Sequence, residues 1–247
     1  MDNWKDNVIF VLVEPEHAGN IGAAARAMKN MGFGRLSLVR PKTEVGEEAG
    51  WFAHGALDVL ESAGAFDDLG DALSEASLVV GTTRRKGRRR GLFVPIEEAA
   101  ARIKGFASGG GRAAVLFGGE RQGLLNEHLE HCAFAFSIPT AAAQPSLNVA
   151  QAVLIAAYEV SRAGLPRAKK KAASGVISHG ELELLLGRFD EALDLLGYGG
   201  KGGDVDVQKR LRANLARVFG RAGLTPGEAA SFQGLCSQIE KKLKGGR

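Results

Sequence analysis

Cysteine is scarce in this chain of 247 residues: Cys132 and Cys236 are the only two, and they do not form a CxxC pair. Two cysteines cannot build a disulfide framework for this length, which indicates a reducing cytoplasm.

Long hydrophobic runs are lacking as well. The longest stretch without a formal charge, residues 131–158, contains prolines and amides, so no membrane span is expected. The first residues, MDNWKDN, carry acids where an export signal carries bases, so export is not expected.

Several motifs of nucleotide, nucleophile and metal chemistry are also missing. The chain has no GxxxxGK[ST] phosphate loop, no GxSxG elbow and no HExxH motif. A GxGxxG pattern occurs at Gly197, Gly199 and Gly202, but no strand-like run precedes it, so we interpret it as a turn. His128 and His131 are spaced to share one helix face beside Cys132. The sequence shows no second group of ligands, so no metal is expected.

Positive charge is concentrated in two places. The formal net charge is +4, yet residues 1–165 carry 17 basic and 19 acidic side chains, whereas residues 166–247 carry 15 and 9. Within the first part, six bases stand in seven residues without an acid: Arg84, Arg85, Lys86, Arg88, Arg89 and Arg90. Like charges at this density repel one another and are stabilised beside phosphates, so we interpret the run as a phosphate contact. The alternative is a solvated loop.

Short apolar runs alternate with helical patterns along the first 163 residues, which predicts a parallel sheet covered by helices on both faces, an α/β fold. The expected strands are Val8–Val13, Leu36–Val39, Leu78–Thr82, Ala113–Phe117 and Phe134–Ile138. The expected helices are Asn20–Met31, Trp51–Glu61, Ile96–Ile103 and Leu147–Ala163. The last of these is apolar nearly all round, which indicates burial in the core or at a subunit interface.

The composition changes after the last of these helices. Residues 1–165 are expected to form one domain, and residues 166–180, with glycine, proline and the Lys169–Lys171 triplet, a basic linker. Residues 181–247 are expected to form a small helical extension. Its predicted helices are Glu181–Leu196, Val205–Phe219 and Pro226–Leu243.

Three segments of the first domain have the composition of a ligand site. In Glu14–Gly32, a strand ends in a turn that opens a helix, whose free amides suit an anion; Arg26 lies on its polar face with Gly22, one turn inside the helix. In Val115–Leu124, glycines follow a buried strand and place Glu120 in the cleft, unless it caps a helix or pairs with Arg121. In Ser137–Ala152, the letters PSLN open a helix, and Ser146 is a plausible N-cap.

Together these segments resemble the three motifs of the SPOUT class of RNA ribose 2'-O-methyltransferases. The matching patterns are NxGxxxRxxxxxG, GxExxGL and SLNxxxA, in that order, and the resemblance covers residues 8–163. The tail resembles that of the TrmJ-type tRNA enzymes of this class, through RFDEALDLLGY and LCSQIEKKL.

The resemblance implies properties that the residue patterns alone do not show. The α/β domain would contain a deep trefoil knot, and the protein would be a homodimer with the RNA site where the subunits meet. S-adenosylmethionine would bind in the knot. The implied cofactor residues are Thr82, Thr83, Arg84, Gly118, Ile138, Pro145, Ser146 and Leu147.

The implied catalytic set is Asn20, Arg26, Glu120, Ser146 and Asn148. A guanidinium stays protonated, so we expect Arg26 to clamp the phosphate beside the target ribose and stabilise the developing alkoxide, with removal of the proton by Arg26 left open. The subgroup implies the first anticodon-loop nucleotide of tRNA, position 32, cytidine or uridine. Alternatives are a ribosomal RNA or another tRNA position, or a member that binds RNA without catalysis. A dehydrogenase is disfavoured because the first turn lacks GxGxxG.

Overall fold

The computed structural model describes residues 4–85, 91–164, 175–198 and 207–244. The first part is a seven-stranded sheet, with every neighbouring pair parallel, in the order β3-β2-β1-β6-β4-β7-β5. The predicted α/β fold with a parallel sheet is confirmed. In chain order the strands are β1 (Val8–Val13), β2 (Arg35–Val39), β3 (Gly64–Phe66), β4 (Leu78–Thr82), β5 (Phe93–Pro95), β6 (Ala113–Gly118) and β7 (Phe134–Ser137).

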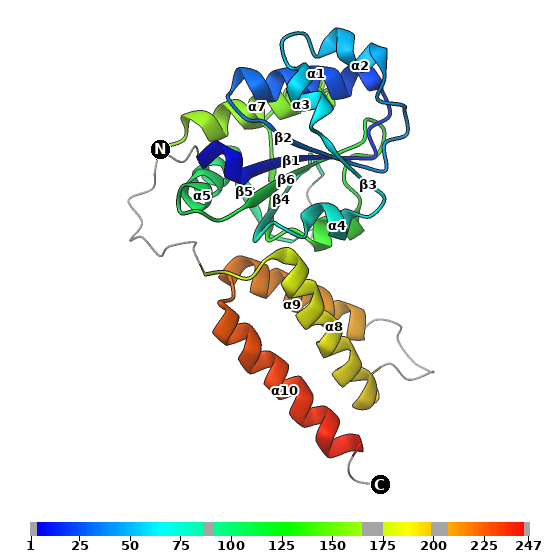
Figure 1. Ribbon diagram of the computed structural model, residues 1–247, viewed down its shortest axis with the longest axis vertical. Helices are drawn as coiled ribbons and strands as arrows, with labels where there is room; N and C mark the ends of the chain where they lie inside the picture. The colour runs from blue at the N-terminus through cyan, green and yellow to red at the C-terminus, as the bar shows by residue number, and fades with distance from the viewer. Residues whose placement is uncertain (1–3, 86–90, 165–174, 199–206, 245–247) are drawn as a thin grey trace.

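Helices cover both faces of this sheet (Figure 1). One face carries α1 (Ala18–Asn30), α5 (Ile96–Ser108) and α7 (Val149–Arg162), with α2 (Glu47–Phe52) and α3 (Leu57–Glu61) packed beside α1. The other face carries α4 (Leu69–Leu73) and α6 (Asn126–Glu130). Alternate residues of β1 belong to the two cores: Phe10 and Leu12 to one, Val11 and Val13 to the other. Burial on both faces explains why this strand is apolar throughout.

The predicted helix Trp51–Glu61 is wrong. The chain forms two short helices, α2 and α3, separated at residues 53–56. Gly55 adopts a φ of 75° within this break, a left-handed conformation that cannot continue a right-handed helix. The edge strands β3 and β5 were not predicted because each has only three residues, too few to show a period.

Helix α7 buries one side and exposes the other. Val153, Ala157 and Val160 are buried against the sheet, α1 and α5. Leu154 and Tyr158, on the other side, are 39% and 50% exposed in the single chain. The predicted core burial is thus confirmed for one side only. In the described part of the chain, no helix combines the length and hydropathy that crossing a bilayer requires.

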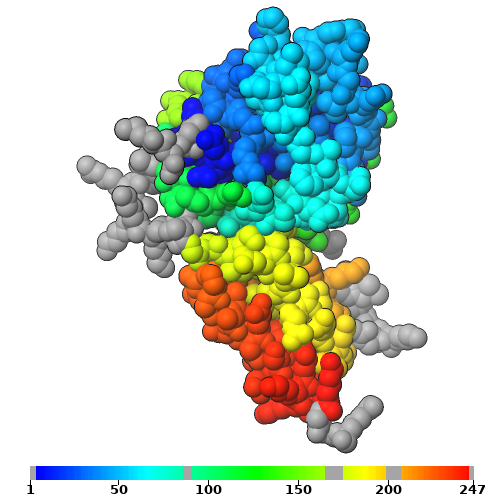
Figure 2. All heavy atoms as spheres, in the orientation of Figure 1, coloured from blue at the N-terminus to red at the C-terminus, as the bar shows by residue number. Residues whose placement is uncertain are grey.

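A second, smaller hydrophobic core belongs to the C-terminal helices α8 (His179–Leu195), α9 (Val207–Ala222) and α10 (Pro226–Lys244), which match the predicted ones closely. Phe189, Phe219 and Phe232 meet there, with ring centroids 4.9–6.1 Å apart. The three helices form a separate lobe below the sheet domain (Figure 2). The amides of His179 and Gly180 donate to the carbonyls of Ala76 and Ser74, which fastens the start of α8 to that domain.

Part of the predicted linker and turn lies outside the described residues, including Lys169–Lys171, Gly199 and Gly202. Gly197 is described: it follows α8 with a φ of 88°, as a C-terminal cap requires. It therefore has the role of a turn glycine, as predicted.

Gly22, predicted on the polar face of α1, is instead buried against α2. A Cβ at Gly22 would lie 1.9 Å from the Ala49 carbonyl oxygen, so α2 would have to shift. We expect Gly22→Ala to lower the free energy of unfolding by about 1–3 kcal/mol. The matched control is Gly187→Ala in α8, where a Cβ meets nothing within 4 Å. Because alanine favours a helix over glycine, that change should raise stability by about 0.5–1 kcal/mol in denaturant titration.

Candidate functional site

An open cavity of about 150 Å³ lies at the carboxyl ends of β4, β6 and β7. Its wall combines the segments that follow these strands with the start of α7. This is the edge where parallel sheets bind ligands. All eight predicted cofactor residues line it: Thr82, Thr83, Arg84, Gly118, Ile138, Pro145, Ser146 and Leu147.

Glycine is required where β6 enters the cavity wall. A Cβ on Gly118 would lie 2.0 Å from the backbone carbon of Gly123, so the loop after β6 folds back directly over this residue. A Cβ on Gly119 would lie 2.4 Å from the carbonyl oxygen of Glu14. The wall there is made of backbone packed on backbone, so neither glycine can be replaced without a shift of the chain.

Hydrogen bonds fix the other two walls. The Thr82 hydroxyl donates to the carbonyl of Leu116 at 2.9 Å, and the Thr83 amide donates to the carbonyl of Phe136 at 3.0 Å. The Thr140 hydroxyl donates to the carbonyl of Pro145 at 3.2 Å, which closes the loop before α7. Bonds within the chain thus define the shape of the cavity.

A chain of hydrogen bonds through Glu120, Asn20 and Asn148, the relay, joins the three predicted segments. Asn20 Nδ2 donates to Glu120 Oε1 at 2.7 Å, and Asn148 Nδ2 donates to Asn20 Oδ1 at 2.8 Å. Glu120 Oε2 accepts from the amide of Glu16 at 2.9 Å. Glu120 is therefore neither a helix cap nor the partner of Arg121, whose side chain pairs with Glu16 at 3.0 Å. Asn20, at the start of α1, is the central member of this relay.

The N-cap of α7 is Asn148, not Ser146. Asn148 Oδ1 accepts from the amides of Ala150 and Gln151, and Gln151 bonds back to the Asn148 amide. One side chain thus caps the helix through its oxygen and joins the relay through its nitrogen. Ser146 stands two residues earlier and lines the cavity, which leaves its hydroxyl available to a ligand.

Arg26 does not lie in the cavity of its own chain. Helix α1 begins at Ala18, so Arg26 is eight residues inside, about 12 Å along the axis, and not one turn as predicted. Its side chain is exposed, and Asn20, Arg26 and Asn148 are not among the residues that line the cavity. Of the predicted catalytic set, the cavity brings together Glu120 and Ser146 only.

Glu14 lies against the residues that follow β6 at this edge of the sheet. It follows β1 with a φ of 51°, a strained conformation that sends its carbonyl toward Gly119. Its carboxylate pairs with Lys42 at 2.8 Å and with Arg40 at 3.3 Å. The Lys42 hydrogen bond lowers the pKa of Glu14 below its usual value. Its stabilising contribution is therefore present at neutral pH and is lost as the pH falls through that lowered pKa.

The basic run begins in the cavity wall. Arg84 and Arg85 are exposed residues that line the cavity, and the Arg85 amide donates to the Thr83 hydroxyl at 3.1 Å. Lys86, Arg88, Arg89 and Arg90 lie outside the described residues. The two described residues of the run thus belong both to the cavity wall and to the exposed surface.

Comparison with known proteins decides the family. The model of the SpoU rRNA Methylase family matches residues 7–158, more than half of the chain. The chain belongs to the SpoU methylase family. The prediction from the three motifs that this protein is a methyltransferase of that kind is confirmed.

Relatives extend this SpoU methylase match over almost the whole chain. The tRNA (cytidine/uridine/adenosine-2'-O-)-methyltransferase TrmJ of Pseudomonas aeruginosa is 34% identical over 97% of this chain and 96% of its own. The tRNA (cytidine/uridine-2'-O-)-methyltransferase TrmJ of Yersinia enterocolitica is 35% identical over 96% and 93%. The crystal structure of TrmJ from Z. mobilis ZM4 is 30% identical, covers 94% of this chain and 99% of its own, and superimposes with a TM-score of 0.81. The predicted closeness to TrmJ-type enzymes is confirmed.

Some wall residues of this SpoU methylase were not predicted. Gly119, Gln122 and Thr140 line the cavity beside the predicted residues. Gly119 stands next to a predicted glycine, and the doubled glycine after a buried strand was the signal for it. Gln122 and Thr140 lie in loops, where the sequence has no helical or strand period. The sequence therefore could not indicate that these residues line the cavity.

Proposed function

We propose that this SpoU methylase transfers the methyl group of S-adenosylmethionine to a ribose 2'-hydroxyl of tRNA. The observation that carries the proposal is the relay of Glu120, Asn20 and Asn148, which joins all three motif segments at the rim of one cavity. The near full-length similarity to enzymes named tRNA 2'-O-methyltransferases supports tRNA as the substrate.

The cavity fits the proposed cofactor. Its wall at Gly118 offers backbone amides and carbonyls at close range, which suits an adenine ring, and Ile138 and Leu147 add apolar surface. When bound, S-adenosylmethionine supplies an activated sulfonium methyl group. Thr83 and Pro145, which both line the cavity, would hold it there. These contacts would orient the cofactor.

The reaction requires a deprotonated ribose hydroxyl in line with the methyl group. Ser146 would orient the nucleotide from the cavity wall, and Glu120 would act through Asn20 as a positioning residue. Arg26 would bind the phosphate beside the target ribose and stabilise the negative charge that develops on the 2'-oxygen.

The protein acts as a homodimer in this proposal. Arg26 lies outside the cavity of its own chain, so it can reach a reacting ribose only where another surface approaches α1. Helix α7 packs on α1 and exposes Leu154 and Tyr158 on its outer side. An apolar pair of this kind is suited to burial against a second subunit.

Charge on α7 should therefore separate the subunits. We expect Leu154→Glu with Tyr158→Glu to convert a dimer into a monomer in light scattering at micromolar concentration, and to lose methyl transfer with it, because a buried carboxylate pair is strongly disfavoured. The control is Leu184→Glu, on a side chain of α8 that is 71% exposed. A wild-type protein that is already monomeric would contradict the homodimer.

We also propose the finer topology implied by the family: a deep trefoil knot within residues 1–165, a linker over 166–180 and a helical extension over 181–247. The separate core of α8, α9 and α10 supports the division.

The basic run from Arg84 to Arg90 would bind the phosphates of tRNA. We expect Arg84→Gln with Arg85→Gln to weaken tRNA binding and to reduce the slope of log affinity against log salt by up to about 1.4–1.8, since each lost phosphate contact removes about 0.7–0.9. The control double variant is Arg102→Gln with Arg112→Gln, two arginines paired with Glu98 and Glu75. An unchanged slope in the Arg84 and Arg85 variant would identify these residues as solvated.

The decisive experiment is a labelled methyl transfer assay on bulk tRNA, with calorimetric titration of S-adenosylmethionine and mass-spectrometric mapping of the product. We expect a methyl group on the ribose of cytidine or uridine 32. Cofactor binding without transfer to tRNA would favour ribosomal RNA, and a methyl group elsewhere would name another tRNA position. RNA binding without cofactor affinity would refute catalysis.

A further inference from the structure

Three metal-binding side chains meet where the sheet domain contacts the C-terminal helices. His131 follows α6 in the sheet domain, whereas His179 and Glu183 lie one turn apart on α8. His131 Nδ1 lies 3.3 Å from His179 Nε2. Glu183 Oε1 lies 3.9 Å from the first of these nitrogens and 3.8 Å from the second. The sequence showed no second ligand group for His131 because these residues are about 50 positions apart.

These separations are close to those of a tetrahedral zinc site. With bonds of about 2.0–2.2 Å, neighbouring ligand atoms of a tetrahedron lie about 3.3–3.6 Å apart. The histidine nitrogens, 3.3 Å apart, fall within this range, and the two separations from Glu183, 3.8 and 3.9 Å, exceed it by only about 0.2–0.3 Å, so small side-chain shifts would bring all three atoms onto one ion. We propose that His131, His179 and Glu183 bind one Zn²⁺ ion, with a water molecule as the fourth ligand, and so fasten the C-terminal helices to the sheet domain.

Hydrogen bonding among the three groups does not explain their convergence. One proton between the two histidines satisfies the 3.3 Å contact. The 3.8 and 3.9 Å separations from Glu183 exceed a hydrogen bond, although its oxygen faces both nitrogens. A cation at the common centre would use all three lone pairs. His128, in contrast, lies apart from the cluster: its Nδ1 accepts from the amide of Leu125.

The surroundings favour a bound cation. The His179 side chain is only 4% exposed, and burial favours the neutral imidazole, whose nitrogen offers a lone pair to a cation. Arg212 donates to Glu183 Oε2 and to Asp190 Oδ2, which leaves Glu183 Oε1 directed toward the histidines. Such a partner orients a ligand. Among the described groups that act on His131, the carboxylates of Glu183, Asp68 and Glu130 favour a positive charge there, and Arg212 opposes it.

The full chain, stripped with a chelator, tests the site. Calorimetric titration with Zn²⁺ should give one ion per chain with a dissociation constant in the micromolar range or below, and Co²⁺ should develop the visible absorption of a tetrahedral site. At a hundredfold excess over the dissociation constant, the midpoint of thermal unfolding should rise by about 5–10 °C. Neither measurement depends on methyl transfer.

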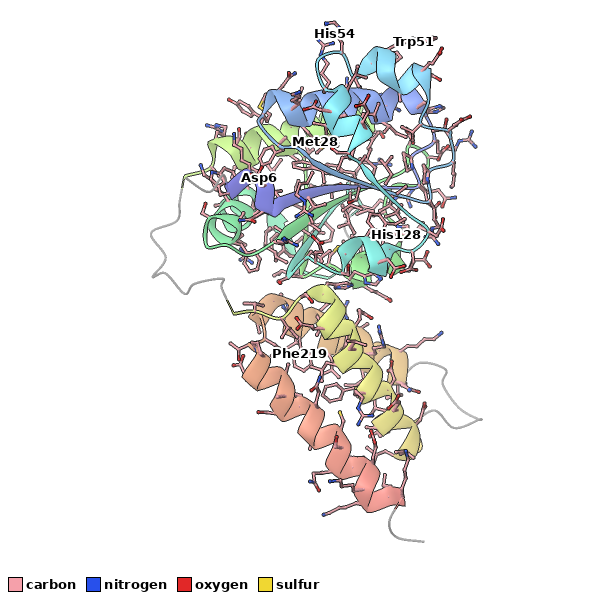
Figure 3. The ribbon with its side chains drawn as sticks, viewed as in Figure 1. Asp6, Met28, Trp51, His54, His128 and Phe219 are labelled. Carbon is pink, nitrogen blue, oxygen red and sulfur yellow. The ribbon has the colours of Figure 1, made fainter. Side chains whose placement is uncertain are left out.

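Variants locate the ion. His131→Gln and Glu183→Gln, on opposite sides of the contact, should each weaken Zn²⁺ binding more than about 100-fold, and Arg212→Gln by about 10–100-fold. The control is His54→Ala, an exposed histidine at the far end of the molecule (Figure 3), which should bind Zn²⁺ as wild type does. Circular dichroism checks that each variant folds. Absence of saturable binding to the wild type, or binding that both ligand variants retain, would overturn the proposal.

Discussion

Replacing Arg26 by alanine is expected to lower kcat/KM for methyl transfer by about 10²–10³-fold or more, with the dissociation constant of S-adenosylmethionine nearly unchanged. The loss follows from the removal of a positive donor at the charge that develops on the 2'-oxygen. The unchanged cofactor affinity follows from the position of Arg26, which does not line the cavity. Calorimetry for binding and a labelled-methyl assay for turnover separate the two effects.

Two control variants sharpen this prediction. Arg26→Lys keeps the charge but loses the forked donor, so it should recover only part of the rate. Arg102→Ala removes another exposed helical arginine, which pairs with Glu98 on α5, and it should keep full activity. Full turnover in Arg26→Ala would remove this residue from the mechanism and leave the exposed face of α1 without a catalytic role.

The sheet could be predicted from the sequence because its central strands are buried on both faces. A run such as Val8–Val13 has no polar alternative, and neighbouring strands of the same kind predict a parallel sheet. The short helices beside α1 could not be predicted as they stand. The pattern over Trp51–Glu61 has a helical period, yet Gly55 turns the chain within it.

The cavity wall could be predicted, but its hydrogen bonds could not. The strand ends define which loops meet, and the motif resemblance selected residues that all line one cavity. The partners within the relay are separated by 100 and 128 residues. From the sequence, Ser146 is the expected cap of α7 and Asn148 an expected catalytic residue, whereas the structure gives Asn148 both the cap and the bond to Asn20. Only tertiary contact distinguishes these roles.

The contact between the two parts of the chain was equally beyond the sequence. His131 and His179 come from elements whose relative position no local sequence pattern encodes. Hydrogen bonds donated by the backbone amides of His179 and Gly180 fix that position. The position of Arg26 relative to the cavity differs from the prediction for a related reason. Arg26 lies outside the cavity of its own chain, and only the homodimer that we propose would bring it to a reacting ribose.

Asn20→Asp should disable the relay without changing its shape. Asn20 donates to Glu120 and accepts from Asn148, and an aspartate can only accept. Two carboxylates would then face each other at about the present 2.7 Å, which raises the pKa of the pair. We expect methyl transfer to fall by about 10²-fold at pH 8, with a loss of unfolding free energy of about 1.5–3 kcal/mol.

The pH dependence identifies the cause. Because the pKa of the carboxyl pair is raised in the folded variant, its stability is best preserved below the unfolded pKa and declines as the pH rises through the folded one. The stability gap to wild type should therefore widen from pH 5 to pH 8 in denaturant titrations. Asn20→Ala loses the same bonds without adding a charge, so its gap should stay constant. Asn126→Asp, at an exposed residue, should show neither effect. A constant gap in Asn20→Asp would mean that Glu120 does not face residue 20 in solution.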